Sequence, residues 1–181
     1  MSMSIEISFS KTSKPSGGLV IALGSVSEPV SPAARTIDPA GQLDKAVKVS
    51  GFAGKSLTSA DIIAPVDSPA DRIALLGTGD PDKLTPHDWL RIGGKIVPLI
   101  SKSRKVTVLL GKGPEPSPEA AADMALGLLM RAYSFDLYKT KKGEDDDDGP
   151  HPVDLALARQ PAPGAVRRAL AARFGEHGLD R

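Results

Sequence analysis

The chain has 181 residues, of which 40% are hydrophobic and 25% charged, a composition typical of a soluble globular domain with room for a further segment. Its formal net charge of +1 predicts no general attraction to nucleic acid or to an anionic membrane. The sequence has no cysteine, which excludes disulfides, thiolate metal sites and cysteine nucleophiles, and its three histidines are too far apart in sequence to indicate a metal cluster.

The first 49 residues predict two strands, a loop and a helix. Residues 5–9 alternate strictly between apolar and polar, which predicts a half-buried strand. Residues 19–23 form a continuous apolar run that ends at Gly24, as in a strand buried on both faces. We expect residues 25–39, rich in proline and serine, to form an exposed loop, and residues 41–49 to form a weakly amphipathic helix.

The middle of the sequence predicts a hairpin. Residues 62–64 and 72–76 are short strand candidates, and the turn-forming residues 67–71 lie between them. The second strand ends at a glycine turn, residues 77–79.

A helix and a strand are expected next. Thr85 is a favourable N-cap for a helix over residues 85–100. The pair Gly93-Gly94 and Pro98 are costly inside a helix, so they indicate a kink or very close packing. Residues 105–110 are the clearest strand of the chain.

The longest predicted helix runs from Ser117 to Lys142. Ser117 is a favourable N-cap, and Pro118 suits the first helical position. Apolar side chains cover so much of the helix that we expect it to be buried. Its small residues, Ala121, Ala125 and Gly127, would let another element approach closely.

The character of the sequence changes after this helix. Residues 143–150 are acidic and rich in breakers, which predicts a solvated linker, although the aspartates could also chelate a divalent ion weakly. Residues 153–157 are a possible strand, and residues 165–174 a possible helix. The order of elements predicts an α/β fold with a mixed β-sheet flanked by helices, parallel at the helical crossovers and antiparallel at the hairpin.

Three glycine-rich segments could bind phosphate. Residues 51–56 resemble a phosphate loop, but the pattern needs a glycine where Val49 stands, so a tight turn is the better interpretation. Residues 77–79 and 111–113 each follow a strand, and their amides could cradle phosphate or simply form tight turns.

No grouping of residues indicates catalysis. The aspartates before the acidic run are scattered through turns, where aspartate is common for its own reasons, and His87 is expected at the surface. We therefore assign no catalytic, cofactor-binding or metal-binding residue in this chain.

Three stretches nevertheless resemble a known family. Residues 52–56 look like a Phe-x-Gly-Lys turn, and residues 72–79 with 89–94 look like a strand, a glycine turn and the following helix. Residues 127–142 are similar to a helix exit of the form Tyr-x-Phe-Asp-x-Tyr-Lys-Thr-Lys. All three resemble the N-terminal domain of the leucyl aminopeptidase family of metallopeptidases.

The resemblance implies a division of the chain. Residues 1–142 would be the macro-like N-terminal domain, and residues 143–152 an acidic linker. Residues 153–181 would be a remnant of the start of the catalytic domain.

The resemblance also implies a function for the complete family member. A catalytic domain would hold two divalent metals, zinc or manganese, and remove N-terminal residues from peptides by two-metal hydrolysis. The partners would be that domain and sister subunits, in cytoplasmic homohexamers. The family's metal-ligand signature is Asn-Thr-Asp-Ala-Glu-Gly-Arg-Leu, and this chain contains no asparagine. We therefore expect a truncated or fragmentary leucyl aminopeptidase that is inactive alone and needs no cofactor of its own.

Parts of the sequence are compatible with two other functions. A stand-alone macro-like module would bind ADP-ribose or a related phosphate ligand through the glycine loops. DNA binding would rest on Lys139, Lys141 and Lys142, but the acidic run beside them opposes phosphate contact, so we expect no nucleic-acid partner. No membrane association is expected, since no apolar run approaches the length of a membrane span.

Overall fold

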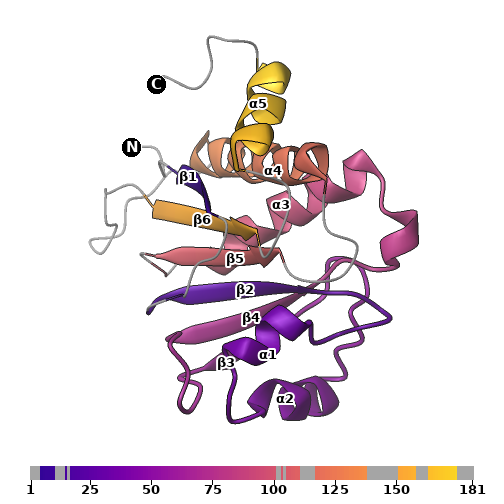
Figure 1. Ribbon diagram of the computed structural model, residues 1–181, viewed down its shortest axis with the longest axis vertical. Coiled ribbons are helices and arrows are strands. Elements are labelled where there is room, and N and C mark those ends of the chain that lie inside the picture. The colour runs from indigo at the N-terminus through magenta and orange to yellow at the C-terminus, as the bar shows by residue number, and fades with distance from the viewer. Residues whose placement is uncertain are drawn as a thin grey trace.

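The computed structural model describes residues 5–10, 15, 17–100, 103, 105–110, 117–137, 151–157 and 163–174. Its centre is a six-stranded sheet in the order β1-β6-β5-β2-β4-β3 (Figure 1). The strands are β1 (Ile5–Ser10), β2 (Leu19–Gly24), β3 (Ser59–Ile63), β4 (Arg72–Gly77), β5 (Val106–Leu110) and β6 (His151–Leu157). Neighbouring strands are parallel except for β3 and β4, which form the expected antiparallel hairpin. The predicted α/β fold with a mixed sheet is confirmed.

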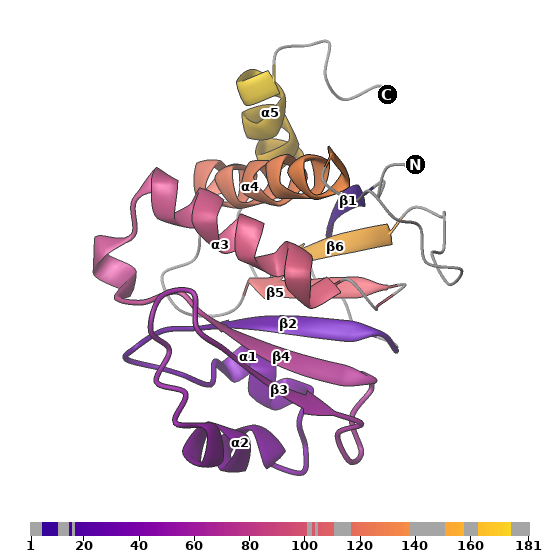
Figure 2. The ribbon, with the colours of Figure 1, turned by 180° about the vertical axis from the view of Figure 1, so that it is seen from behind.

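Helices cover both faces of the sheet. The short helices α1 (Pro32–Thr36) and α2 (Gln42–Ser50) lie on one face, over β2, β4 and β3. On the opposite face lie α3 (Pro86–Ile100) and α4 (Pro118–Leu137), as comparison of Figures 1 and 2 shows. Helix α5 (Pro163–Phe174) packs on α4 and contacts β1. A short 3-10 helix, η1 (Pro81–Lys83), precedes α3.

Strand β2 is buried on both faces, as its apolar run predicts. Leu19, Ile21 and Leu23 pack into the core beneath α3 and α4. Val20 and Ala22 point to the other face and pack into the core beneath α1 and α2. Because side chains alternate along a strand, a strand between two helical layers needs apolar residues at every position.

The expectation of an exposed loop over residues 25–39 is wrong for its second half. Ser31 caps α1, accepting a hydrogen bond from the Ala34 amide at 3.4 Å, and Ala34 is fully buried. Val30 and Ile37 are buried beside it. A five-residue helix is too short to show apolar periodicity, so the proline and serine that begin it read as loop residues.

The predicted helix caps are present. The Thr85 hydroxyl accepts a hydrogen bond from the Asp88 amide at 3.3 Å, and the Asp88 carboxylate accepts from the Thr85 amide at 3.0 Å. The Thr85 hydroxyl also donates to this carboxylate, and these bonds lower the pKa of Asp88 below its ordinary value. At α4, the Ala120 amide donates to the Ser117 hydroxyl at 3.2 Å. Residues 138–142, the expected end of this helix, lie outside the described residues.

Helices α3 and α4 approach each other through glycine. A Cβ atom on Gly93 would overlap the carbonyl oxygen of Met124 and lie 2.8 Å from the carbonyl carbon. A Cβ atom on Gly127 would likewise overlap the carbonyl oxygen of Leu90. The close packing expected at Gly93-Gly94 and along α4 is therefore confirmed, and it explains why glycine stands inside two helices.

Strand β6 and helix α5 confirm the secondary structure expected near the end of the chain, but their place is unexpected. The strand lies between β1 and β5, and Val153 is fully buried. Helix α5 packs on α4 through the buried side chains of Val166 and Leu170. The segment expected to open the next domain thus contributes a strand to this sheet, and the division of the chain at residues 142 and 153 stays a prediction.

Candidate functional site

The most promising place for a ligand is the edge of the sheet where parallel strands end. In open α/β sheets, ligands bind outside the carboxyl ends of the strands. Three loops meet at the ends of β2 and β4: residues 24–28, 54–58 and 77–80. We call this meeting of loops the three-loop junction.

The amides of Gly77, Thr78 and Gly79 already have acceptors. All three donate to backbone carbonyl oxygens of the neighbouring loops: Gly77 to Thr58 at 2.8 Å, Thr78 to Gly24 at 2.8 Å, and Gly79 to Gly54 at 2.9 Å. The Thr78 hydroxyl also donates to the Gly24 carbonyl, at 3.1 Å. These amides would have to leave their present partners to bind phosphate, which supports the interpretation of this segment as a tight structural turn.

The segment 51–56 is also a turn. Gly51 ends α2 with a left-handed backbone at φ 67°. Gly54 has φ 64° and lies so close to the Ser25 carbonyl that a Cβ atom would overlap it. Directly after this segment, the Leu57 amide donates to the Gly77 carbonyl at 2.8 Å, which holds the turn against the end of β4. The remaining phosphate-loop candidate, residues 111–113, lies outside the described residues.

The scattered aspartates have separate structural roles. Asp71 accepts a hydrogen bond from the Gly18 amide at 2.6 Å, and Asp88 caps α3. Asp80 caps η1 and pairs with Lys83 at 2.9 Å, and the hydrogen bond from Lys83 lowers the pKa of Asp80. His87 is exposed, as expected. Within the described part of the chain, no three histidine, aspartate or glutamate residues are grouped to hold a metal ion.

Asp38 has a role that the sequence reasoning did not identify. Its side chain is buried, and one carboxylate oxygen accepts a hydrogen bond from the Leu43 amide at 2.7 Å, in the first turn of α2. It therefore supplies the cap that Gly41, the residue before the helix, has no side chain to provide. The sequence does place the acidic Asp38 shortly before α2. However, Asp38 lies three residues before Gly41, the usual capping position, so the pattern did not predict its role.

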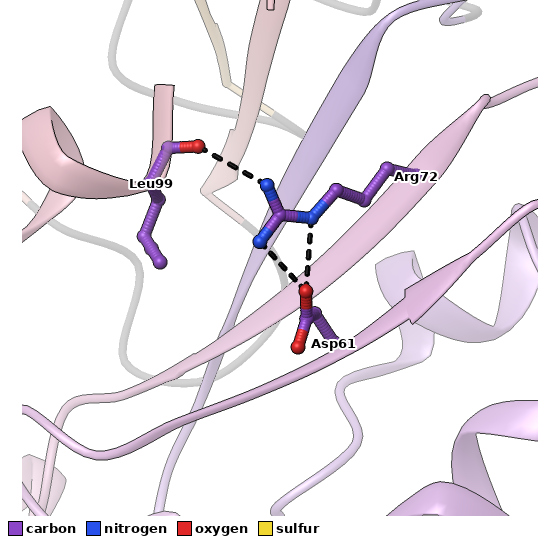
Figure 3. Close-up of polar contacts among 3 residues, drawn as sticks. All are labelled: Asp61, Arg72 and Leu99. Atoms are coloured by element: carbon purple, nitrogen blue, oxygen red, sulfur yellow. Dashed lines mark hydrogen bonds and ion pairs between the residues drawn. The ribbon is translucent and has the colours of Figure 1, made fainter. Parts of the chain in front are cut away.

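Arg72 connects three elements, as Figure 3 shows. Its Nε and Nη2 atoms donate to one carboxylate oxygen of Asp61 at 2.9 and 2.6 Å, which joins β4 to β3. Its Nη1 atom donates to the Leu99 carbonyl at 3.4 Å, in the last turn of α3. Carbonyls there have no partner within the helix and carry the negative end of its dipole, so a cation is favourable.

We expect a modest, salt-sensitive coupling between Arg72 and Asp61. Their side chains are 28% and 41% exposed, so a double-mutant cycle of Arg72→Gln and Asp61→Asn should give about 0.5–1 kcal/mol at low salt. Denaturant unfolding of the four proteins measures it, and the coupling should shrink in high salt. Arg72→Gln alone should cost more than Asp61→Asn, since it also removes the bond to Leu99. Equal coupling at low and high salt would contradict this account.

The fold and the junction define an α/β domain whose strand ends are closed by its own loops. Comparison with known proteins identifies it further. Residues 20–142 match the family described as the cytosol aminopeptidase family, N-terminal domain. The chain therefore belongs to the cytosol aminopeptidase family, and the predicted resemblance is confirmed.

Curated relatives are much longer than this chain. A probable cytosol aminopeptidase of Rhizobium johnstonii is 42% identical over 168 residues, which are 92% of this chain and 34% of the relative. One from Agrobacterium fabrum is 46% identical over 159 residues, which are 87% of this chain and 32% of the relative. The chain thus spans about a third of the length of the curated relatives it matches.

Solved structures agree on the fold. A mutant of tomato leucine aminopeptidase superposes with a TM-score of 0.71 at 21% identity, over 97% of this chain and 36% of that one. The bottromycin maturation enzyme BotP, in complex with Mn, superposes with a TM-score of 0.56 at 16% identity, over 86% and 29% of the two chains. At these identities the likeness establishes the fold. In the described residues, no helix combines the length and the apolar character that crossing a membrane requires.

Proposed function

We propose that this chain serves as the non-catalytic N-terminal domain of a longer leucyl aminopeptidase. The observation that carries the proposal is the family match over residues 20–142, combined with a coverage of about a third of the relatives. The complete protein would remove N-terminal residues from peptides, in the cytoplasm, as part of a homohexamer. The N-terminal domain would then be a structural part of that assembly.

The uses of polar groups in the structure support a structural role. The amides at the ends of β2 and β4 close the three-loop junction. The charged side chains of Arg72 and Asp88 hold elements together or cap a helix. These groups stabilise the fold, and each would lose a partner if it turned to a substrate.

The hydrolytic metals are assigned to the rest of the longer protein. Two divalent ions, zinc or manganese, would need the family's asparagine-containing signature, which this sequence lacks. The residues present therefore do not fit the dinuclear centre, and we assign no ligand of it to this chain. The macro-like character and ADP-ribose binding stay predictions, and no comparison favours them.

An aminopeptidase assay tests the proposal. We expect the purified 181-residue chain to release no leucine from a leucyl peptide, with or without added Mn²⁺ or Zn²⁺. The full-length Agrobacterium fabrum relative, assayed under the same conditions, is the positive control. Metal-dependent leucine release that co-elutes with the 18.9 kDa chain through two separate columns would contradict the proposal.

A further inference from the structure

The two ends of the described chain depend on each other within the sheet. Strand β1 is an edge strand, and β6 is its only neighbour among the six strands. The pairing runs in parallel from Ile5 opposite His151 to Ser10 opposite Ala156. Every ladder hydrogen bond of β1 within the described sheet therefore comes from a strand at the other end of the sequence.

Side chains from both ends complete one part of the core. Phe9 of β1, Val153 of β6, and Val166 and Leu170 of α5 are buried in the core that α3 and α4 cover. Helix α5 contacts α4 and β1, and in both ribbon views it lies at the β1 end of the molecule (Figures 1 and 2). We call β1, β6 and α5 the terminal unit.

The remaining strands keep all their pairings with one another without the terminal unit. Strand β5 pairs with β2, β2 with β4, and β4 with β3. The contact of α3 with α4 also involves no residue of the terminal unit. Opening of the terminal unit would therefore break one boundary of the sheet, the one between β6 and β5, and would leave the rest of the ladder intact.

The pairing of β1 with β6 joins the two strands of the sheet that are farthest apart in the sequence. Joining β1 to β6 closes a loop of nearly the whole chain, whereas the hairpin of β3 and β4 closes a short one. The family match supports the same division, since it covers β2 to α4 and leaves β1, β6 and α5 outside. Proteins open locally in contiguous units that often coincide with supersecondary motifs.

We propose that the terminal unit opens and closes as one cooperative element, separately from the sheet formed by β5, β2, β4 and β3. Insertion of β6 between β1 and β5 is the step that holds the N-terminal strand in place. Any displacement of β6 or α5 is thereby transmitted to β1, at the opposite end of the sequence. This inference does not depend on the proposed function, because it concerns the described chain alone.

Native-state hydrogen exchange on the full chain tests the proposal. We expect the amides of β1 and β6 to exchange through one common opening, with the same dependence on denaturant. The amides of Ile21 in β2 and Ala74 in β4 should exchange at least about 10-fold more slowly, through a larger opening. Identical opening for β1 and β2 would overturn the proposal, since the sheet would then open as a whole.

A substitution at Val153 gives a second measurement. Because Val153 is fully buried, Val153→Asp should raise the exchange of β1 amides by roughly 100-fold or more and leave β2 and β4 within a few-fold of the parent. Val49→Asp is the matched control, because Val49 is 81% exposed and the same change there should leave β1 unaffected. Unchanged protection of β1 in Val153→Asp would overturn the proposal.

A milder variant covers the case in which Val153→Asp fails to fold. Phe9→Ala shortens a buried side chain of β1 and should raise exchange in β6 as well as in β1, because the two strands open together. The measured quantity is the ratio of the exchange rates of β6 amides to those of β2 amides, which should rise in this variant. An increase confined to β1, with β6 protected as in the parent chain, would contradict the common opening.

Discussion

Gly93→Ala should lower the free energy of unfolding by about 1–3 kcal/mol, although alanine favours helices over glycine. The added methyl group would overlap the carbonyl oxygen of Met124 on α4. That atom belongs to the backbone of a long helix and cannot swing aside, so α3 and α4 must separate. Because the contact between these helices covers one face of the sheet, the separation should also loosen the core beneath them. Urea unfolding, compared with the parent protein, measures the change.

The adjacent glycine provides a matched control. At Gly94 an added Cβ atom would meet its nearest neighbours, the Arg131 Cβ and the Gly127 carbonyl oxygen, at 3.7 Å, which is ordinary van der Waals contact. Gly94→Ala should therefore be neutral or stabilising by up to about 1 kcal/mol through helix propensity alone. The two variants make the same chemical change one residue apart. Equal stability of the two would show that close packing of α3 on α4 is not what requires glycine at position 93.

Gly54→Ala should strongly destabilise the three-loop junction. The left-handed backbone at φ 64° costs alanine about 1 kcal/mol, and the methyl group would also overlap the Ser25 carbonyl. Displacing Gly54 would break the bond that its carbonyl accepts from the Gly79 amide. We expect a total loss of about 2–4 kcal/mol, from strain and overpacking together. Denaturant unfolding measures the total, and exchange of the Gly79 amide reports the broken contact.

Gly51→Ala separates the two causes of that loss. Gly51 has nearly the same backbone conformation, at φ 67°, but an added Cβ atom would meet nothing within 4 Å. This variant should lose only about 1 kcal/mol, the cost of the left-handed conformation. If Gly51→Ala and Gly54→Ala lost the same stability, the contact with Ser25 would have no energetic weight, and the junction would be more open than the structure shows.

Local sequence patterns predicted most of the elements because their causes are local. Strict alternation in residues 5–9 and the apolar run in residues 19–23 reflect which faces of a strand are buried. Thr85 and Ser117 accept hydrogen bonds from backbone amides only three residues away, so the sequence alone predicted that they cap α3 and α4. Helix α1 was missed because five residues give no periodic pattern.

Local sequence patterns did not predict the contacts made at the candidate site. A glycine turn after a strand has the same sequence whether its amides face a ligand or another loop. At Gly77, Thr78 and Gly79 the acceptors come from loops about 20 to 54 residues away in the chain, and no local pattern reports them. For the same reason no local pattern predicted the hydrogen bond from Arg72 to the Leu99 carbonyl, because the two residues are 27 positions apart in the sequence.

By itself the sequence determined the fold class, most of the helices and strands, and the family to which the chain belongs, because short-range periodicity, capping and motif residues carry that information. Only the tertiary structure decided the strand order. It placed β6 between β1 and β5, and it assigned the glycine amides to structural bonds. Those outcomes depend on which distant segments pack together. Parallel strands and loop-to-loop hydrogen bonds join residues far apart in the chain, so the free energy that selects them comes from the assembled core and not from any single stretch of sequence.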